Sequence, residues 1–565
     1  MVKVVTVEEM RAIEQAADAA GHSYSDMMQL AGRALADVTL QVILEKALDP
    51  LIVVLVGPGN NGGDGLVAAR YLAEDIEEAQ VVAYLLKNRD DAVFHAAQKA
   101  GVATISAEQD DDFQELENWL GDASVVLDAL FGTGTHLPIK GAAAKLLKHV
   151  HKTLTERQAY HTSVTNPTRP VAIIDRPYVM AVDCPSGLDC DTGELDPLTL
   201  HADATITFAA AKPGLLTFPG AEAVGQLHIG DIGLPDKLKP YDAVKISLAD
   251  GNTIQGLLPK RGRGGHKGTY GKAMIVAGSA NYIGAAFLAG SAAYRSGAGL
   301  VTVAAPHGIV PTLAAMLPEA TWLLLPHDMG AINERAIEVV RKDLDTYSAL
   351  LVGPGWGQDE VTHKFLHGLL TPLPSVKTKP QMGFQVHTEA TEAAADAAAL
   401  NLPPLVIDAD GLNLLAQMDK WWQMLPKNTI LTPHPGEFAR LAGIDSIQTV
   451  QADRLKLALK YAKKWRCIVV LKGAFTVVAQ PNGQATMIPF ATSALATAGT
   501  GDVLAGTIVG LLAQGADAAA AAVVGAWLHG FAGTQAETAL GTPTSVMASD
   551  VLRQLPTALA ITEQH

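Results

Sequence analysis

The sequence predicts an α/β protein made of two large domains, each built around a parallel sheet. The chain has 565 residues, which is too long for one ordinary domain. In both halves, short β-rich runs alternate with helical stretches, as expected for βαβ units. Glycine-rich turns follow several of these runs, at the strand ends where open α/β sheets bind their ligands.

The first half contains four clear strand candidates and one helix that follows a glycine-rich turn. We expect strands at 51–56, 81–86, 124–127 and 179–182, and the helix at 64–73. The polar stretch 151–169 interrupts the alternation and is predicted to be an inserted surface loop. The pattern lapses from about 234 to 245, so a domain boundary is expected between 235 and 250.

The second half repeats the alternation. Strands are expected at 272–276, 300–304, 349–352, 405–407, 429–431 and 467–471, with alanine-rich helices between them and an almost entirely helical end. The stretch 371–401 is predicted to contain another exposed loop before a helix. The two halves carry different motifs, which indicates a fusion rather than a duplication.

Composition limits the function classes. Apolar residues make up 48% and charged residues 18%, and no apolar run is long enough to cross a bilayer. We therefore expect a soluble protein without a membrane partner. The first residues show no apolar segment with a small-residue cleavage site, so the cytoplasm is the expected location.

Charge and cysteine content exclude further classes. The net charge of −16 disfavours nucleic-acid binding, and the basic segment 260–268 is too small for such a surface. Local groups could still hold a small phosphorylated ligand. The cysteines at 184, 190 and 467 make neither a disulfide framework nor a thiolate metal site.

The most informative motif is AGTGD at 498–502, followed by an apolar, helix-like run. Gly499 and Gly501 would allow positive φ and close approach to a phosphate at a helix N-terminus. Asp502 would serve either as a base or as the helix N-cap.

Three motifs of the first half follow predicted strands and point at one crevice. The turn 57–65 has five glycines and two asparagines, whose amides could read a ligand or hold a cation. The second motif, 128–138, begins at Asp128. The third, 181–189, contains Asp183 and Ser186.

The second half has its own strand-end motifs. The turns 353–357 and 432–437 supply glycines, His434 and a carboxylate, and the segment 471–476 supplies Lys472 for phosphate oxygens. Small residues at 278–286 indicate close ligand approach or plain core packing. Acidic residues in 407–413 could serve a magnesium ion or cap the next helix.

The first-half motifs, together with the segments 10–14 and 27–32, closely resemble the NAD(P)HX epimerase family over most of residues 1–235. The resemblance implies a Rossmann-like three-layer α/β/α domain at 1–240, with Asp183 as the acid/base. Leu137 stands where the family often has a basic residue. The implied substrate-binding residues are Asn60, Asn61, Gly62, Gly63, Asp64, Gly132, Thr133, Gly134, Thr135, His136, Leu137, Pro138 and Asp183, and Asn61, Asp128 and Ser186 would hold a potassium ion.

The second-half motifs, in order, resemble the ADP- or ATP-dependent NAD(P)HX dehydratases over about 245–560. The resemblance implies a ribokinase-like α/β domain at 241–565, with magnesium and ADP, in which Asp502 accepts the hydroxyl proton. The implied substrate-binding residues are Ala285, Gly355, Gly357, His434 and Asp502, and the implied nucleotide-binding residues are Lys472, Gly473, Ala474, Phe475, Thr476 and Gly501.

Together the resemblances predict a repair enzyme that epimerises the R and S forms of NADHX and NADPHX. It would dehydrate the S form to NAD(P)H at the expense of ADP, giving AMP and phosphate, as an assembly of identical copies. One alternative is a ribokinase-like kinase of a vitamin-precursor alcohol. Another makes the first domain a non-catalytic interaction module.

Overall fold

The computed structural model describes residues 1–134, 137–160, 172–174, 176–371 and 402–564. Their contacts divide the chain into two compact units, 2–247 and 248–565, with Met1 assigned to the second. Most of the expected loop at 371–401, and residues 161–169 of the loop expected at 151–169, lie outside the described residues.

The first unit is built on a sheet in which all neighbouring strands are parallel. Its strand order is β10 (Gln226–Gly230), β9 (Ala204–Phe208), β8 (Tyr178–Val182), β5 (Val125–Ala129), β2 (Leu51–Val56), β3 (Gln80–Leu85) and β4 (Ala103–Ser106). Because β2 lies between β3 and β5, the chain reverses its direction of travel across the sheet there. This is the strand order of doubly wound dinucleotide-binding folds, whose ligand crevice lies at that reversal.

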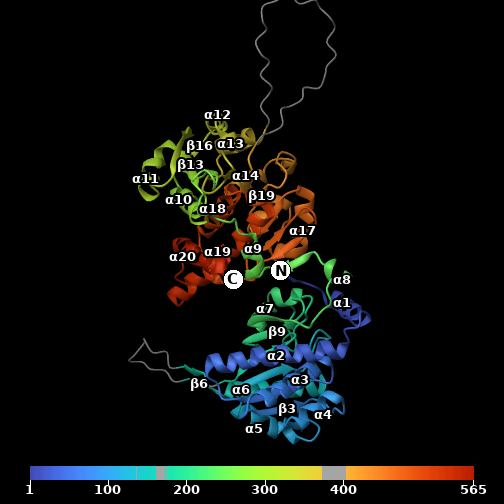
Figure 1. The fold of residues 1–565 in the computed structure, drawn as a ribbon. Coiled ribbons are helices and arrows are strands. Elements are labelled where there is room, and N and C mark those ends of the chain that lie inside the picture. The colour runs from blue at the N-terminus through green and yellow to red at the C-terminus, as the bar shows by residue number, and fades with distance from the viewer. Residues whose placement is uncertain (135–136, 161–171, 175, 372–401, 565) are drawn as a thin grey trace, which may run out of the picture. The chain divides into compact units, whose positions relative to one another are not determined.

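Helices cover both faces of this sheet. The side chains of Ile52, Val54 and Val56 share a core with α1 (Val7–Ala19), α2 (Tyr24–Lys46) and α3 (Asn60–Asp75). Val53 and Leu55 point the other way, into a core with α5 (Gln114–Asp122) and α6 (Gly141–Glu156). The unit therefore has three layers; α2 is its longest helix in Figure 1 and packs beside α3.

The remaining elements of this unit are short. They are β1 (Val2–Lys3), α4 (Ala92–Lys99), the 3-10 turns η1 (Asp111–Phe113) and η2 (Pro213–Leu216), the antiparallel pair β6 (Gln158–Tyr160) and β7 (Ala172–Ile174), α7 (Ala221–Val224), α8 (Lys239–Asp242) and β11 (Ile246–Leu248), in which the division between the units falls.

Two sequence predictions are wrong in their boundaries. Helix α3 begins at Asn60, four residues before the predicted start, so the Asn-Gly segment forms its first turn. The stretch 151–156 is not loop but the end of α6. Leu146, Val150 and Leu154 form a buried stripe at four-residue spacing, which continues the helix while polar residues occupy its outer side.

The second unit has a mixed sheet that is mostly parallel. Within this unit the strand order is β22 (Ala485–Met487), β21 (Val477–Ala479), β20 (Ile468–Leu471), β19 (Ile430–Leu431), β18 (Leu405–Ile407), β17 (Ala349–Val352), β12 (Lys272–Val276), β13 (Leu300–Pro306) and β14 (Thr321–Leu325). Only the β20–β21 and β21–β22 pairs are antiparallel among these strands.

Helices follow most of these strands. They are α9 (Gly251–Leu257), α10 (Ile283–Arg295), α11 (Val310–Met316), α12 (Ala336–Arg341), α13 (Glu360–Leu370), α14 (Asp410–Leu415), α15 (Pro435–Ala442), α16 (Ile447–Ala452), α17 (Arg454–Trp465), α18 (Thr500–Ala513), α19 (Ala518–Leu540) and α20 (Ala548–Gln564). The short pair β15 (His327–Asp328) and β16 (Ala331–Ile332) and the turns η3 (His307–Ile309), η4 (Leu344–Thr346), η5 (Trp421–Gln423) and η6 (Ser493–Leu495) complete the unit.

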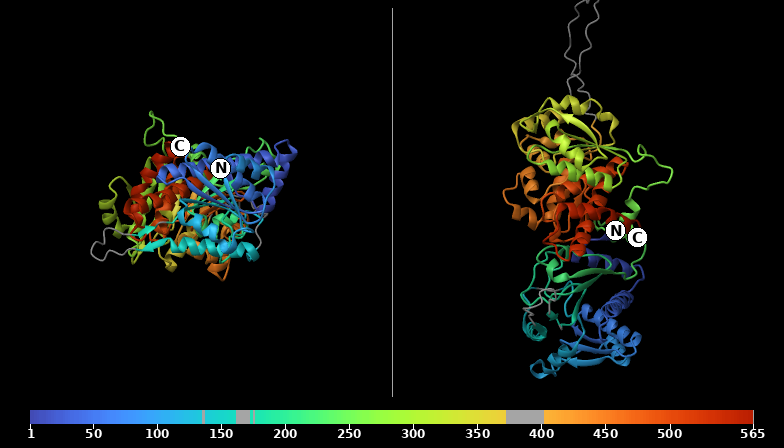
Figure 2. Two further views of the ribbon diagram at one scale, coloured as in Figure 1. Left: turned by 90° about the horizontal axis from the view of Figure 1, so that it is seen from below. Right: turned by 90° about the vertical axis from the view of Figure 1, so that its left-hand side faces the viewer.

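A large core of this unit joins the sheet to α10, α18, α19 and α20. The last three helices lie at the red end of the colour scale and pack together in both views of Figure 2. Helix α18 approaches α10 closely, because a Cβ at Gly506 would lie 2.3 Å from the Ala289 carbonyl oxygen. The predicted α/β class and the helical end are confirmed.

None of the described helices is long and apolar enough to cross a membrane.

Candidate active sites

The first-unit site lies where β2, β5 and β8 end. Gly57 must be a glycine, because a Cβ there would lie 1.8 Å from the Leu130 carbonyl oxygen in the turn after β5. A Cβ at Gly62 would lie 2.0 Å from the Gly57 carbonyl oxygen. The missing side chains therefore let the two turns and the start of α3 meet at the reversal point of the sheet.

A cavity of about 630 Å³ opens at this point. Seven predicted substrate-binding residues line it: Asn60, Asn61, Asp64, Gly132, Thr133, Gly134 and Asp183. Gly62, Gly63, Leu137 and Pro138 are not among its lining residues, and Thr135 and His136 lie outside the described residues. At Gly63 a Cβ would lie 2.8 Å from Met28 Cε, so that glycine serves the packing of α3 on α2.

Asp183 follows β8 in a left-handed conformation, with φ +64°. Its Oδ1 accepts hydrogen bonds from Thr207 Oγ1 at 2.9 Å and from Lys212 Nζ at 2.6 Å. The Lys212 side chain is 1% exposed. Sequence reasoning missed Lys212, and the one local signal was a lysine directly after three alanines, in a segment too apolar for a surface position.

Two more carboxyl groups, those of Glu14 and Asp64, line the same cavity. Burial raises the pKa of both, and the charge of Asp183 adds to the rise. Neither carboxyl has a hydrogen bond or an ion pair within the described part of the chain. The site thus combines one carboxyl group paired with a lysine and two unpaired carboxyl groups whose pKa values are raised.

Of the three residues predicted to hold potassium, Asp128 and Ser186 are in contact, and Asn61 lines the cavity. Ser186 Oγ donates to Asp128 Oδ1 at 2.6 Å, and the Ser186 backbone N–H donates to Oδ2 at 2.8 Å. Burial raises the pKa of Asp128. Both amide atoms of Asn61 are buried without a hydrogen-bond partner, and the Oδ1 atom lies 3.0 Å from the Cβ position of Gly132.

In the second unit, the AGTGD turn forms the start of α18. Gly499 is the N-cap, with φ +91°, so Asp502 lies in the first turn and does not cap the helix. Burial, with Asp408 as the next cause, raises the pKa of Asp502 to about 7, although Lys472 opposes the rise. A carboxyl group with such a pKa suits proton transfer at neutral pH.

Lys472 lies beside this turn and is held by two acidic groups. Its Nζ atom is 2.8 Å from Asp408 Oδ1 and 3.8 Å from Glu437 Oε2. Burial would lower the pKa of Lys472, but its acidic neighbours, Asp408 first, raise it overall. A Cβ at Gly501 would lie 3.3 Å from this Nζ, so the lysine and the helix N-terminus share one small space.

His434 and Glu437 begin α15 as a reciprocal cap. His434 Nδ1 accepts from the backbone N–H of Gly436 at 3.0 Å, and Glu437 Oε2 accepts from that of His434 at 2.8 Å. Burial, with Lys472 as the next cause, lowers the pKa of His434 to about 4. The imidazole is therefore neutral at physiological pH, while its side chain stays 50% exposed.

The remaining predicted substrate residues lie in contact with one another. A Cβ at Gly355, where φ is +66°, would lie 2.7 Å from Ala285 Cβ. The Gly357 backbone N–H donates to Asp410 Oδ2 at 2.8 Å, and the charge of Asp410 acts on Asp502. The structure thus connects the start of α10, the turn after β17 and the AGTGD turn.

The loop 473–476 follows β20 and is shaped by Arg454, which sequence reasoning also missed. Arg454 donates to the Leu471 carbonyl oxygen at 3.0 Å and to that of Ala474. Burial lowers the pKa of this guanidinium to about 10. Thr476 Oγ1 donates to the Gly473 carbonyl oxygen at 2.9 Å. These bonds fix the backbone that is predicted to hold the nucleotide.

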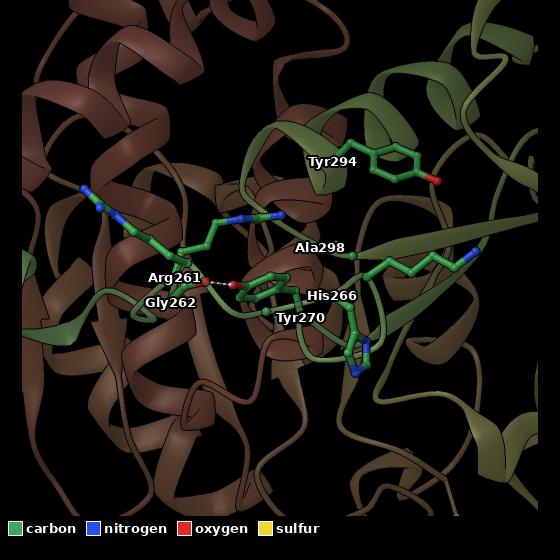
Figure 3. A pocket seen from close by; sticks show the side chains of 10 residues that line it. Arg261, Gly262, His266, Tyr270, Tyr294 and Ala298 are labelled. Atoms are coloured by element: carbon green, nitrogen blue, oxygen red, sulfur yellow. Dashed lines mark hydrogen bonds between the residues drawn. The ribbon is translucent and has the colours of Figure 1, made fainter.

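A separate basic pocket of about 620 Å³ lies at the amino ends of β12 and β13 (Figure 3). It contains none of the predicted site residues. Arg261 is bound internally, because its Nη1 donates to the Gly297 carbonyl oxygen at 2.9 Å and its guanidinium lies 4.0 Å from the Tyr270 ring centre. The pocket therefore lies at the amino ends of the strands, and the AGTGD turn lies at the opposite end of the sheet.

Comparison with known proteins gives matches over both units. A family model described as NAD(P)H-hydrate dehydratase matches residues 273–376 and 382–557, and one described as YjeF-related protein N-terminus matches 24–214. A protein of Moorella thermoacetica named bifunctional NAD(P)H-hydrate repair enzyme Nnr is 36% identical over 521 residues, which cover 91% of this chain and 88% of that protein. A protein of the same name from Escherichia coli is 31% identical, with 96% and 91% covered.

A solved structure of an ADP/ATP-dependent NAD(P)H-hydrate dehydratase from Bacillus subtilis, co-crystallised with ATP and Mg²⁺, is 30% identical. It covers 57% of this chain and all of that chain, with a TM-score of 0.44.

The two sites and their folds define a bifunctional enzyme of nucleotide metabolism, with a doubly wound, Rossmann-like unit followed by a second α/β unit. The chain belongs to the family of bifunctional NAD(P)H-hydrate repair enzymes. This confirms the resemblance stated from the motifs. Membership of this family also excludes the alternative that the chain is a kinase of a vitamin-precursor alcohol.

Proposed function

We propose that the first unit interconverts the R and S forms of hydrated NADH and NADPH, and that the second dehydrates the S form with ADP as the phosphoryl donor. The observation that carries this proposal is the presence of one acid/base carboxyl group in each site, Asp183 beside Lys212 and Asp502 beside Lys472. The first unit is then an enzyme and not an interaction module.

In the epimerase site, Asp183 would exchange a proton with the hydroxyl group on the ring carbon next to nitrogen. That carbon is a hemiaminal, so it can open or lose its hydroxide and re-form with either configuration. Asn60, Thr133 and the backbone of Gly132–Gly134 line the cavity, where they would orient the nucleotide.

Asn61, Asp128 and Ser186 fit a potassium ion in this unit. Asn61 offers a buried oxygen without a partner, and no lysine or arginine pairs with the buried Asp128 within the described residues. A monovalent cation bound there would supply the missing positive charge and fix the turn after β5.

In the dehydratase site, Asp502 would take the proton of the ring hydroxyl group. The hydroxyl oxygen would then bond to the β-phosphorus of ADP, and AMP would leave. Hydroxide is a poor leaving group, whereas the phosphate formed in this way departs readily. The ring nitrogen supplies the electrons, and loss of a proton from the neighbouring carbon restores the dihydronicotinamide. Lys472 and the N-terminus of α18 would stabilise the transferring phosphoryl group.

Magnesium also fits this site. Asp408 and Asp410 offer carboxylates near Lys472 and Asp502, and this ion commonly uses one or two carboxylates together with substrate phosphates. Bound there, it would neutralise phosphate charge. Loop 473–476 and Gly501 would hold the nucleotide.

The test uses the purified full chain with each hydrated form of NADH, with and without ADP. Recovery of the 340 nm absorbance from both forms supports the proposal, and its absence for both refutes it. In Asp183→Asn, recovery from the R form should be lost and recovery from the S form kept. R-form recovery at the wild-type rate in this variant would make the first unit a non-catalytic module.

We further propose that the protein acts in the cytoplasm as an assembly of identical copies. Size-exclusion chromatography with light scattering tests the assembly, and a mass of one chain at micromolar concentration would refute it.

A further inference from the structure

The epimerase cavity contains three carboxyl groups but one lysine. Asp183, Glu14 and Asp64 all line it; Asp183 acts electrostatically on both of the others, and Glu14 acts on Asp64. Because like charges oppose one another's ionisation, the contacts of each carboxyl group decide which of them can act as the base. The further charged or titratable groups that act on this cluster are Lys212, Arg11, Arg89, Cys184 and Cys190.

We propose that Lys212 is the positioning residue that selects Asp183, and not Glu14 or Asp64, as the base of the epimerase reaction. This inference rests on the proposed function of the first unit. It concerns a residue that lies 29 positions after Asp183 and was not part of any motif in the sequence.

The contacts of Lys212 show why it acts through Asp183. Its ammonium group has three protons and three acceptors: Asp183 Oδ1 at 2.6 Å, Thr207 Oγ1 at 2.7 Å and the Phe208 carbonyl oxygen at 3.5 Å. No proton is left over for a substrate. Burial would lower the pKa of Lys212, but its neighbours, Asp183 first, together raise it overall, so the ammonium stays charged.

The same contacts orient the carboxylate. Lys212 and Thr207 both donate to Oδ1, and no hydrogen bond of the described residues uses Oδ2. Asp183 lines the cavity, so Oδ2 is the oxygen available to a ligand proton. The ammonium of Lys212 lies 2.6 Å from Oδ1 of Asp183, while Glu14 and Asp64 have no such partner within the described residues.

A purely structural role for this pair makes a different prediction. Breaking a buried ion pair destabilises the fold, but it would not by itself change the pH dependence of the remaining activity. The pH profile of epimer exchange therefore separates positioning from structure.

The experiment measures exchange between the R and S forms without ADP, in the full chain, from pH 5.5 to 9. Lys212→Met should lower kcat about 100-fold with KM changed less than about threefold, because proton transfer typically contributes 10²–10⁴-fold to rate. The acid limb should move up by about one pH unit or more, since Asp183 would then lack its ion-pair partner beside two other carboxyl groups. Dehydration of the S form with ADP, in the same preparation, should stay at the wild-type rate.

Thr207→Val provides a second variant that removes one donor to Oδ1 with little change in shape, and should lower kcat about tenfold with a smaller shift of the acid limb. The matched control is Arg176→Met, which breaks the ion pair with Asp203 elsewhere in this unit and should leave the pH profile unchanged.

Unchanged kcat and acid limb in Lys212→Met would overturn the inference. If that variant does not fold, wild-type kcat and acid limb in Thr207→Val would overturn it. Absence of exchange in the wild-type protein would instead refute the proposed function itself.

Discussion

Replacing Asp502 with asparagine should stabilise the second unit at neutral and alkaline pH while abolishing dehydration. Asp502 is partly buried, and this burial, with Asp408 as the next cause, raises the pKa of its carboxyl group from 3.8 to about 7. In the folded protein its ionisation is therefore unfavourable, and an amide of the same shape removes that cost.

The magnitude follows from the shift. A difference of about 3 pH units, at 1.36 kcal/mol per unit, gives about 4 kcal/mol as the upper limit of the cost of ionised Asp502. Because the folded pKa is raised, the wild-type protein is most stable below the unfolded value and loses this contribution as pH rises through about 7. The advantage of Asp502→Asn should thus grow by about 2–3 kcal/mol between pH 5 and pH 8.

Urea unfolding followed by tryptophan fluorescence measures this difference. Trp119 is the only tryptophan of the first unit, so the signal reports mainly on the second. At each pH, the free energy of unfolding of the wild type is subtracted from that of the variant. The contributions of the other titrating groups cancel in this difference. A stability difference that does not change from pH 5 to pH 8 would show that the folded protein does not raise the pKa of Asp502. A variant less stable than the wild type at pH 8 would show the same.

Three other substitutions test particular contacts. Gly501→Ala should raise the KM for ADP about tenfold with little loss of stability, because its Cβ would meet side-chain ends and no backbone atom, Lys472 Nζ at 3.3 Å and Asp408 Oδ2 at 3.8 Å; an unchanged KM would contradict the nucleotide role. Asp128→Asn should remove any dependence of epimer exchange on potassium, measured by replacing KCl with tetramethylammonium chloride, and retained dependence would exclude this residue as a ligand. Gly62→Ala should destabilise the first unit by about 1–3 kcal/mol or more in thermal unfolding, because its Cβ would lie 2.0 Å from the Gly57 backbone oxygen; an unchanged Tm would be contrary evidence.

Much of the fold could be predicted because its signals are local. Buried parallel strands such as 51–56 are continuous apolar runs, and the glycine-rich turns after them mark the strand ends. Strands β9 and β14 were missed, since threonine and alanine in the first and partial exposure of the second weaken that signal. The start of α3 was missed because asparagine and glycine are poor helix formers, and only packing against neighbouring turns makes the segment 60–63 helical.

The sequence by itself determined the α/β class, the order of the motifs and the carboxylates Asp183 and Asp502, because each of these lies at a strand end or helix start that a few neighbouring residues define. Tertiary structure alone decided which charges meet. Lys212 lies in the segment after β9 and contacts Asp183 at the end of β8. Lys472 contacts Asp408, which lies 64 positions earlier in the chain. The charge state of a buried carboxyl group depends on neighbours in space and on burial, and neither quantity is a property of the local sequence.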